Sequence, residues 1–81
     1  MQVTIQLFAG AREAAGADNI AVDIDDDSNY ADLAEAVTAA CPALAPLVAA
    51  GRFAAGDQYV DKSAAVNPAA DIALIPPVSG G

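Results

Sequence analysis

The sequence contains no histidine, and Cys41 is its single cysteine. A disulfide within the chain is therefore impossible, and a zinc site made of cysteine and histidine would have too few ligands. Without histidine, acid–base or nucleophilic catalysis would depend on lysine, carboxylates or Cys41. No stretch combines these groups into an activated pair, so we expect neither a catalytic constellation nor a metal site in this chain. The composition leaves open whether the chain acts as an enzyme.

Basic residues are also scarce. Arg12, Arg52 and Lys62 stand against eleven acidic residues, which gives a formal net charge of −8. No basic patch can neutralise phosphates, so nucleic acid is not an expected partner. An acidic surface favours basic protein partners through attraction that salt weakens. Simple solubility or salt adaptation explains the same charge, and both interpretations stay open.

Long apolar runs are missing as well. The longest uncharged segment, residues 36–51, is too short to span a bilayer, and Pro42 and Pro46 interrupt it. The first residues lack the basic and apolar regions of a signal peptide. With its one free thiol, the chain is expected to be cytoplasmic and not to bind membranes.

Two patterns of alternating apolar residues predict strands at the start of the chain. Val3, Ile5 and Leu7 share one side of a strand over residues 2–8. Ile20, Val22 and Ile24 do the same in a second strand, after a turn or helical loop over residues 9–16. Further strands are expected over residues 52–55, 58–60 and 71–75, with a Gly56-Asp57 turn between the first two and a loop over residues 61–70.

A helix is predicted between the second and third strands. Asn29 is a suitable N-cap, and Leu33, Val37 and Cys41 form an apolar stripe at a spacing of four. The helix should stop near Cys41, because a residue before proline avoids helical angles. A second short helix fits residues 43–50. The order predicts an α+β, ubiquitin-like β-grasp fold: a small mixed sheet with one main helix across one face. This domain covers residues 1–75, and residues 76–81 form an extended tail.

The parity of the strands suggests an apolar patch. Phe8 falls opposite the core residues of the first strand, and Ile75 falls opposite those of the last strand. In a sheet covered on one face only, both side chains would lie on the uncovered face, together with Tyr59. Such patches often mark an interface. A β-bulge that turns Phe8 inward is the alternative.

The tail has a composition that suits a narrow, stiff projection. Pro76 and Pro77 cannot donate backbone hydrogen bonds and favour an extended path. Gly80 and Gly81 carry no side chain, so the tip can enter a confined site. A frayed terminus is the alternative interpretation. The carboxylate of Gly81 becomes electrophilic if ATP converts it to an acyl adenylate, and a sulfur nucleophile can then displace AMP. Another protein must supply that site, since the sequence has no phosphate-binding loop.

At this point the sequence resembles a known family. "LFAGAREAAG", "YADLAEAV" and "ALIPPVSGG" are similar to the MoaD-type small subunit of molybdopterin synthase, a ubiquitin-like sulfur carrier. The resemblance implies that a ubiquitin-activating-type adenylyltransferase uses ATP to adenylate Gly81, which then becomes a thiocarboxylate. The tail would insert into the large synthase subunit of a heterotetramer and donate sulfur for the molybdopterin dithiolene. No cofactor is implied for this chain itself, because ATP is used by the activating enzyme.

The resemblance also implies which residues contact the partners. The matching positions are Phe8, Tyr59 and Ile75 at apolar interfaces, Arg12 at a polar contact, and Pro76, Pro77 and Val78 in the inserted tail. Related carriers deliver sulfur to thiazole or tRNA, or are conjugated to lysines as protein modifiers. The double proline and the length make the thiazole branch the weaker alternative. The remaining alternative is a non-reacting binding module in which Gly80 and Gly81 have no function.

Overall fold

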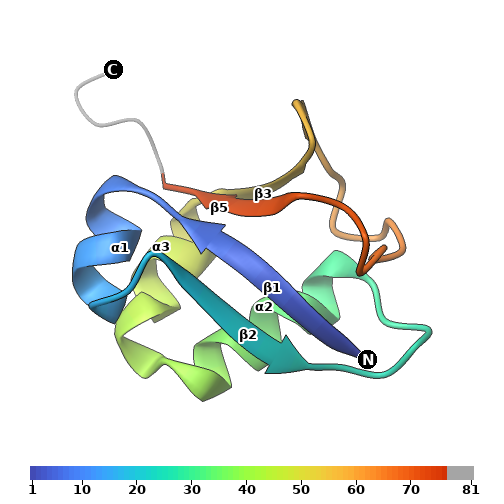
Figure 1. Ribbon diagram of the computed structural model, residues 1–81, viewed down its shortest axis with the longest axis horizontal. Coiled ribbons are helices and arrows are strands. Elements are labelled where there is room, and N and C mark those ends of the chain that lie inside the picture. Colours follow the sequence, from blue (N-terminus) through green and yellow to red (C-terminus); the bar gives the residue numbers. More distant parts are fainter. Residues whose placement is uncertain (77–81) are drawn as a thin grey trace.

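The computed structural model describes residues 1–76. Its elements follow the order β1 (Gln2–Leu7), α1 (Ala9–Ala15), β2 (Asn19–Asp23), α2 (Tyr30–Ala40), the 3-10 helix η1 (Pro42–Leu44), α3 (Ala45–Ala50), β3 (Arg52–Ala55), β4 (Gln58–Tyr59) and β5 (Ile72–Ile75) (Figure 1).

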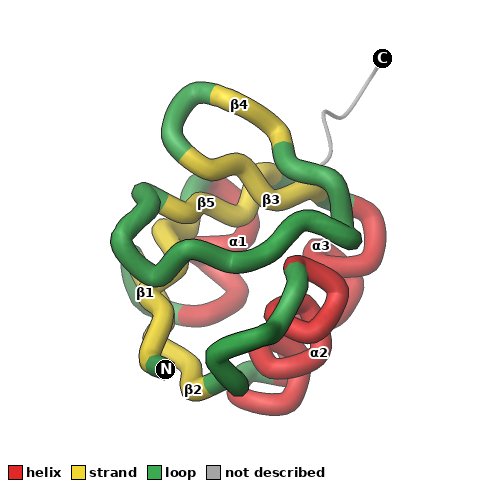
Figure 2. Tube along the Cα trace, turned by 90° about the vertical axis from the view of Figure 1, so that its right-hand side faces the viewer, coloured by secondary structure: helices red, strands yellow, loops and turns green. Residues whose placement is uncertain are grey.

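The strands form one mixed sheet in the order β2-β1-β5-β3-β4. The central strand β5 is parallel to its neighbour β1, and the other neighbouring strands are antiparallel. The helices gather on one side of this sheet (Figure 2). The predicted β-grasp fold is therefore confirmed, although the first strand is shorter than expected. It ends at Leu7, and Phe8 instead occupies the N-cap position of α1.

Helix α2 starts and ends where local chemistry predicts. The Asn29 side chain accepts a hydrogen bond from the Asp32 amide at 2.9 Å, and the Asp32 carboxylate accepts one from the Asn29 amide at 3.1 Å. This reciprocal capping box satisfies two amides that the helix itself leaves unpaired. At the other end, Cys41 has left the helical region, with φ −141° and ψ 88°, as expected before Pro42. Cys41 is half-buried at the edge of the core, whereas the stripe had placed it inside.

The core lies between the sheet and the helices. Its largest fully buried side chains are Val3, Ile5, Leu7, Leu33, Val37, Leu44, Ile72 and Leu74. The alternating residues of β1 and β5 thus face inward as predicted, with Leu7 paired to Leu74 in register. The opposite side of the sheet, turned away from α2, is called the open face below.

Candidate docking face and tail root

Three strands bring their ends together where the chain leaves the domain. Strands β1 and β5 are parallel and pair Leu7 with Leu74. Phe8, just after β1, and Ile75, the last residue of β5, therefore lie at the same end of the sheet. Strand β3 is antiparallel to β5 and pairs Arg52 with Ile75. The last described residues, Ile75 and Pro76, are called the tail root, and both are half-buried. The tail therefore starts in the middle of the sheet, between its two neighbouring strands.

Phe8 lies on the open face beside the tail root. Its backbone stays extended after β1, with φ −128° and ψ 154°, so the side-chain alternation of the strand continues for one more residue. Ala9 then takes a left-handed φ of 49°, which turns the chain into α1. Phe8 remains 51% exposed, as the parity argument predicted for a large apolar side chain. A bulge that turns it inward is excluded.

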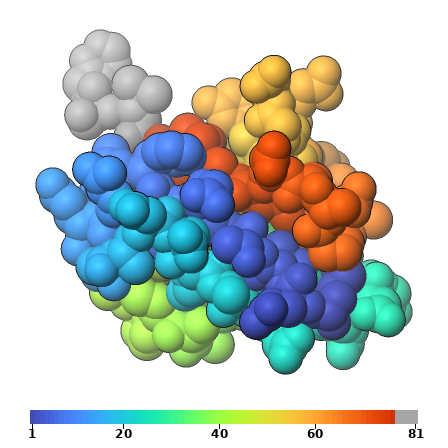
Figure 3. All heavy atoms as spheres, in the orientation of Figure 1, coloured from blue at the N-terminus to red at the C-terminus, as the bar shows by residue number. Residues whose placement is uncertain are grey.

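Tyr59 reaches the same face from the neighbouring hairpin. It pairs with Ala54, which pairs in turn with Ala73 of β5, so these three side chains point the same way. Its ring is 55% exposed, and the Arg52 guanidinium carbon lies 4.4 Å from the ring centroid. This cation–π contact keeps a positive charge among the apolar groups. We call Phe8, Arg52, Tyr59 and Ile75 the docking patch. Figure 3 shows the side of the molecule on which β2, β1 and β5 form adjacent coloured bands.

Arg52 is the member of the docking patch that sequence reasoning missed. In the sequence it stands out only as one of three basic residues. The signal that could have found it is the Gly56-Asp57 turn, because a tight hairpin there puts residues 52 and 59 near each other on one face. Gly56 has the left-handed φ of 63° that this turn requires. Arg12, predicted as a polar contact, lies on α1 with its side chain exposed, and it forms an ion pair with the Asp18 carboxylate at 3.7 Å.

Four predicted site residues, Pro77, Val78, Gly80 and Gly81, lie outside the described residues.

Charge is distributed unevenly between the two ends of the sheet. Arg52, and Arg12 on the helix that follows β1, lie toward the tail root. The opposite end carries an acidic group of Asp23, Asp25, Asp26 and Asp27. There the Met1 amine lies 3.4 Å from the Asp26 carboxylate and 3.9 Å from that of Asp23. Within residues 1–76, no group of three or more His, Cys, Asp or Glu side chains is arranged to hold a metal ion.

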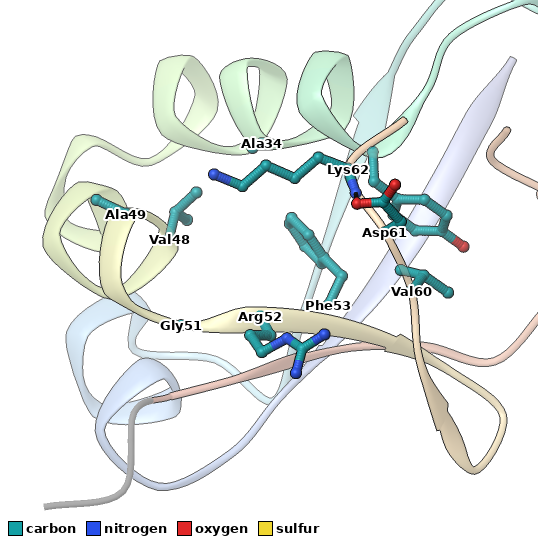
Figure 4. Close-up of a pocket in the computed structure, with 10 residues that line it drawn as sticks. Ala34, Val48, Ala49, Gly51, Arg52, Phe53, Val60, Asp61 and Lys62 are labelled. Carbon is teal, nitrogen blue, oxygen red and sulfur yellow. Dashed lines mark hydrogen bonds between the residues drawn. The ribbon is translucent and has the colours of Figure 1, made fainter. Parts of the chain in front are cut away.

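A separate cavity of about 310 Å³ opens on the helical side of the sheet (Figure 4). Its lining combines Tyr30, Ala34, Val48, Phe53 and Val60 with the polar residues Asp61 and Lys62. Arg52 also borders the cavity, but its side chain lies on the other side of β3 from Phe53 (Figure 4). The Lys62 side chain extends across the opening toward α3 (Figure 4). The hydroxyl of Ser63 and the amide of Lys62 donate hydrogen bonds to the Asp61 carboxylate, at 2.6 and 2.9 Å, and hold the pKa of Asp61 below its ordinary value. This carboxylate stays ionised and is not a proton donor at neutral pH.

Among residues 1–76, the geometry thus offers an exposed docking patch beside the tail root. No helix among residues 1–76 is both long and apolar enough to cross a bilayer.

Comparison with known proteins agrees with this arrangement. The model of the ThiS family matches residues 5–81. The molybdopterin synthase sulfur carrier subunit of Chlamydomonas reinhardtii is 36% identical over 84 aligned positions, which cover 100% of both chains. The protein of the same name from Dictyostelium discoideum is 32% identical and covers 99% of this chain and 96% of its own. Among solved structures, SAMP1 of Haloferax volcanii superposes with a TM-score of 0.85 at 28% identity, over 100% of both chains.

Proposed function

This chain belongs to the ThiS family, and from that premise we propose that it is the sulfur carrier subunit of a molybdopterin synthase. The observation that carries the proposal is the end-to-end match with two chains of that name, at 36% and 32% identity. The position of the docking patch beside the tail root supports it. A partner that binds the docking patch would contact the tail at the same time.

The proposed chemistry takes place on the Gly81 carboxylate, inside two successive partner proteins. A ubiquitin-activating-type adenylyltransferase binds ATP, the carboxylate oxygen attacks the α-phosphorus, and pyrophosphate leaves. Hydrosulfide then attacks the carbonyl carbon of the acyl adenylate, and AMP leaves. The resulting thiocarboxylate donates its sulfur within the large synthase subunit. This chain contributes the narrow Gly80-Gly81 tip and its position, while ATP is bound by the activating enzyme.

The docking patch accounts for how a transient partner is held. A tail of six residues offers little contact area, so the exposed rings of Phe8 and Tyr59 should supply most of the apolar contact. Arg52 and Arg12 can add polar contacts at the edge of that area. The carboxylates at the far end add a long-range attraction to basic partner surfaces, which raises the association rate at low salt. We propose a cytoplasmic location, where ATP is available and the Cys41 thiol stays reduced.

A purified system tests the proposal. The chain is incubated with ATP, sulfide and an activating enzyme, and intact mass analysis should show one oxygen replaced by sulfur. Addition of the large subunit and a cyclic pyranopterin precursor should then yield molybdopterin. The matched control lacks Gly81: we expect no sulfur transfer and an unchanged melting temperature, because the described core ends at Leu74. Normal transfer by the truncated chain would refute the carrier role.

The likeness to SAMP1, a small archaeal modifier protein, favours a second candidate, conjugation to lysines of other proteins. Both routes begin with an acyl adenylate at Gly81, so they separate only at the next acceptor. The discriminating measurement adds a lysine-rich acceptor protein to the activated chain. If isopeptide-linked products form and molybdopterin does not, the chain is a protein modifier and not a synthase subunit.

A further inference from the structure

Gly51 occupies the point at which helix α3 meets the tail root. Its amide donates a hydrogen bond to the Leu47 carbonyl at 2.7 Å, which closes the last turn of α3. The next residue, Arg52, begins β3 and pairs with Ile75 at the end of β5. Figure 4 labels Gly51 at this junction of helix and strand. One residue therefore joins the end of α3 to the strand beside the tail.

Gly51 has no room for a side chain. A Cβ at this position would lie 2.5 Å from the Ile75 carbonyl oxygen and 2.6 Å from the Leu47 carbonyl oxygen. Both atoms belong to the backbone, so no change of rotamer relieves the overlap. Ordinary contacts of a methyl carbon are well above 3 Å, and the two carbonyls would have to retreat by roughly 0.5 Å or more. The φ of −90° suits any residue, so space and not conformation requires glycine here.

We infer that Gly51 is a positioning residue for the reacting end of the chain, an inference that rests on the proposed carrier function. The Ile75 carbonyl belongs to the peptide that joins Ile75 to Pro76. Proline fixes its own φ near −65°, so a reorientation of this peptide is passed on with little freedom to absorb it. Gly51 lets α3 abut this carbonyl and thereby sets the direction in which the chain leaves the sheet.

The expected effect falls on the reaction rate and spares the affinity. Misplacement of a reacting group by about 1 Å can lower a rate by about 100-fold. For Gly51→Ala we expect a 10- to 100-fold lower single-turnover rate constant for sulfur transfer, on the basis of this estimate. The side chains of the docking patch are all chemically unchanged, and the atoms that must move are the backbone carbonyls of Leu47 and Ile75. The Kd for the large subunit should therefore change by less than about 3-fold, a difference under 1 kcal/mol.

The experiment compares chains that already carry a chemically prepared thiocarboxylate, so the activation step is bypassed. Single-turnover sulfur transfer to the cyclic pyranopterin precursor and affinity for the large subunit are measured on each chain. The matched control is Gly10→Ala, because a Cβ at Gly10 meets no atom within 4 Å. A second control, Val37→Ala, opens a cavity beneath helix α2 in the core and lowers stability without touching the docking patch or Gly51. Both controls should transfer sulfur at the wild-type rate per folded molecule.

The outcomes separate the proposed carrier function from the positioning role of Gly51. No transfer by the wild-type chain refutes the carrier function itself. Wild-type transfer with an equal rate for Gly51→Ala overturns only the positioning role. A slower Gly51→Ala chain whose deficit disappears per folded molecule, or matches a fall in affinity, also overturns it. Where the variant folds poorly, the same comparison is made in the Gly10→Ala background, which replaces a helical glycine and is therefore more stable.

Discussion

Replacement of Phe8 by alanine tests whether the docking patch holds the partner. Phe8 sits between β1 and α1, next to the tail root, and 51% of its surface is exposed in the isolated domain. A partner that covers the open face would bury the rest of this ring. The substitution should therefore weaken the complex much more than it weakens the fold.

The cost to stability follows from the exposed fraction. Full burial of a phenylalanine stabilises by roughly 1.5–3 kcal/mol, and about half of this ring is already in water. The Phe8 side chain makes no capping hydrogen bond to α1, so alanine removes no cap. We expect a loss of about 1 kcal/mol in the free energy of unfolding. For a domain of this size, that lowers the melting temperature by about 4–8 °C.

The cost to binding should be larger. Truncation of a central aromatic residue in an interface often removes about 2–4 kcal/mol of binding free energy. This range corresponds to a Kd for the large subunit that is roughly 30- to 1,000-fold weaker. Titration calorimetry and thermal unfolding of the same variant give both quantities under one set of conditions.

Phe53→Leu supplies the matched control, since Phe53 is the other phenylalanine of the chain. Its ring is only 7% exposed, and its centroid lies 5.9 Å from that of Tyr30 in the core. This change should cost about 1 kcal/mol in stability and leave the affinity within about 3-fold of the wild type. Unchanged affinity in Phe8→Ala would refute the assignment of the docking patch, even if its stability falls as expected.

Three further predictions use the same domain. Cys41→Ser should keep full sulfur transfer, because the sulfur is carried on a carboxyl carbon. The half-buried position limits the stability cost to about 1–2 kcal/mol, and a folded but inactive variant would place the thiol in the mechanism. Asn29→Ala removes the α2 capping box and should lower the free energy of unfolding by about 1 kcal/mol in urea titrations. Burial raises the pKa of Tyr30 above its ordinary value of 10.0, so the unfolded chain ionises first. Stability should be intact below pH 10 and fall as pH rises through the folded pKa, and Tyr30→Phe should lessen that fall.

Local patterns were sufficient for most of the fold. The alternation in β1 fixed which side of the strand is buried, because a shift by one residue would expose Val3, Ile5 and Leu7 together. The α2 boundaries followed from Asn29 and Pro42, which act within a few residues of themselves. One exception was the end of β1, where Phe8 continues the pattern although the hydrogen-bonded ladder has stopped. Side-chain alternation depends on extended backbone angles. It does not show whether a neighbouring strand is still hydrogen-bonded at that residue.

The docking patch could be predicted only in part. Parity placed Phe8 and Ile75 opposite the core, and the exposure of Phe8 confirmed its side. That both flank one tail root depends on the parallel pairing of β1 with β5, which joins residues about 67 positions apart. Arg52 needed one further fact, the register of β3 against β5.

Two properties can be read from the residue types alone: the tail contains two prolines and two glycines, and the chain has no histidine, no possible internal disulfide and few basic residues. These properties belong to individual residues and do not depend on how the chain folds. The tertiary structure decided what surrounds the tail root. It set Phe8, Arg52 and Tyr59 on one face and brought Gly51 against the Ile75 carbonyl, 24 residues later in the chain. Close approaches between distant backbone segments arise from strand pairing and helix packing, and a glycine gives no sign in the sequence of which atom it makes room for.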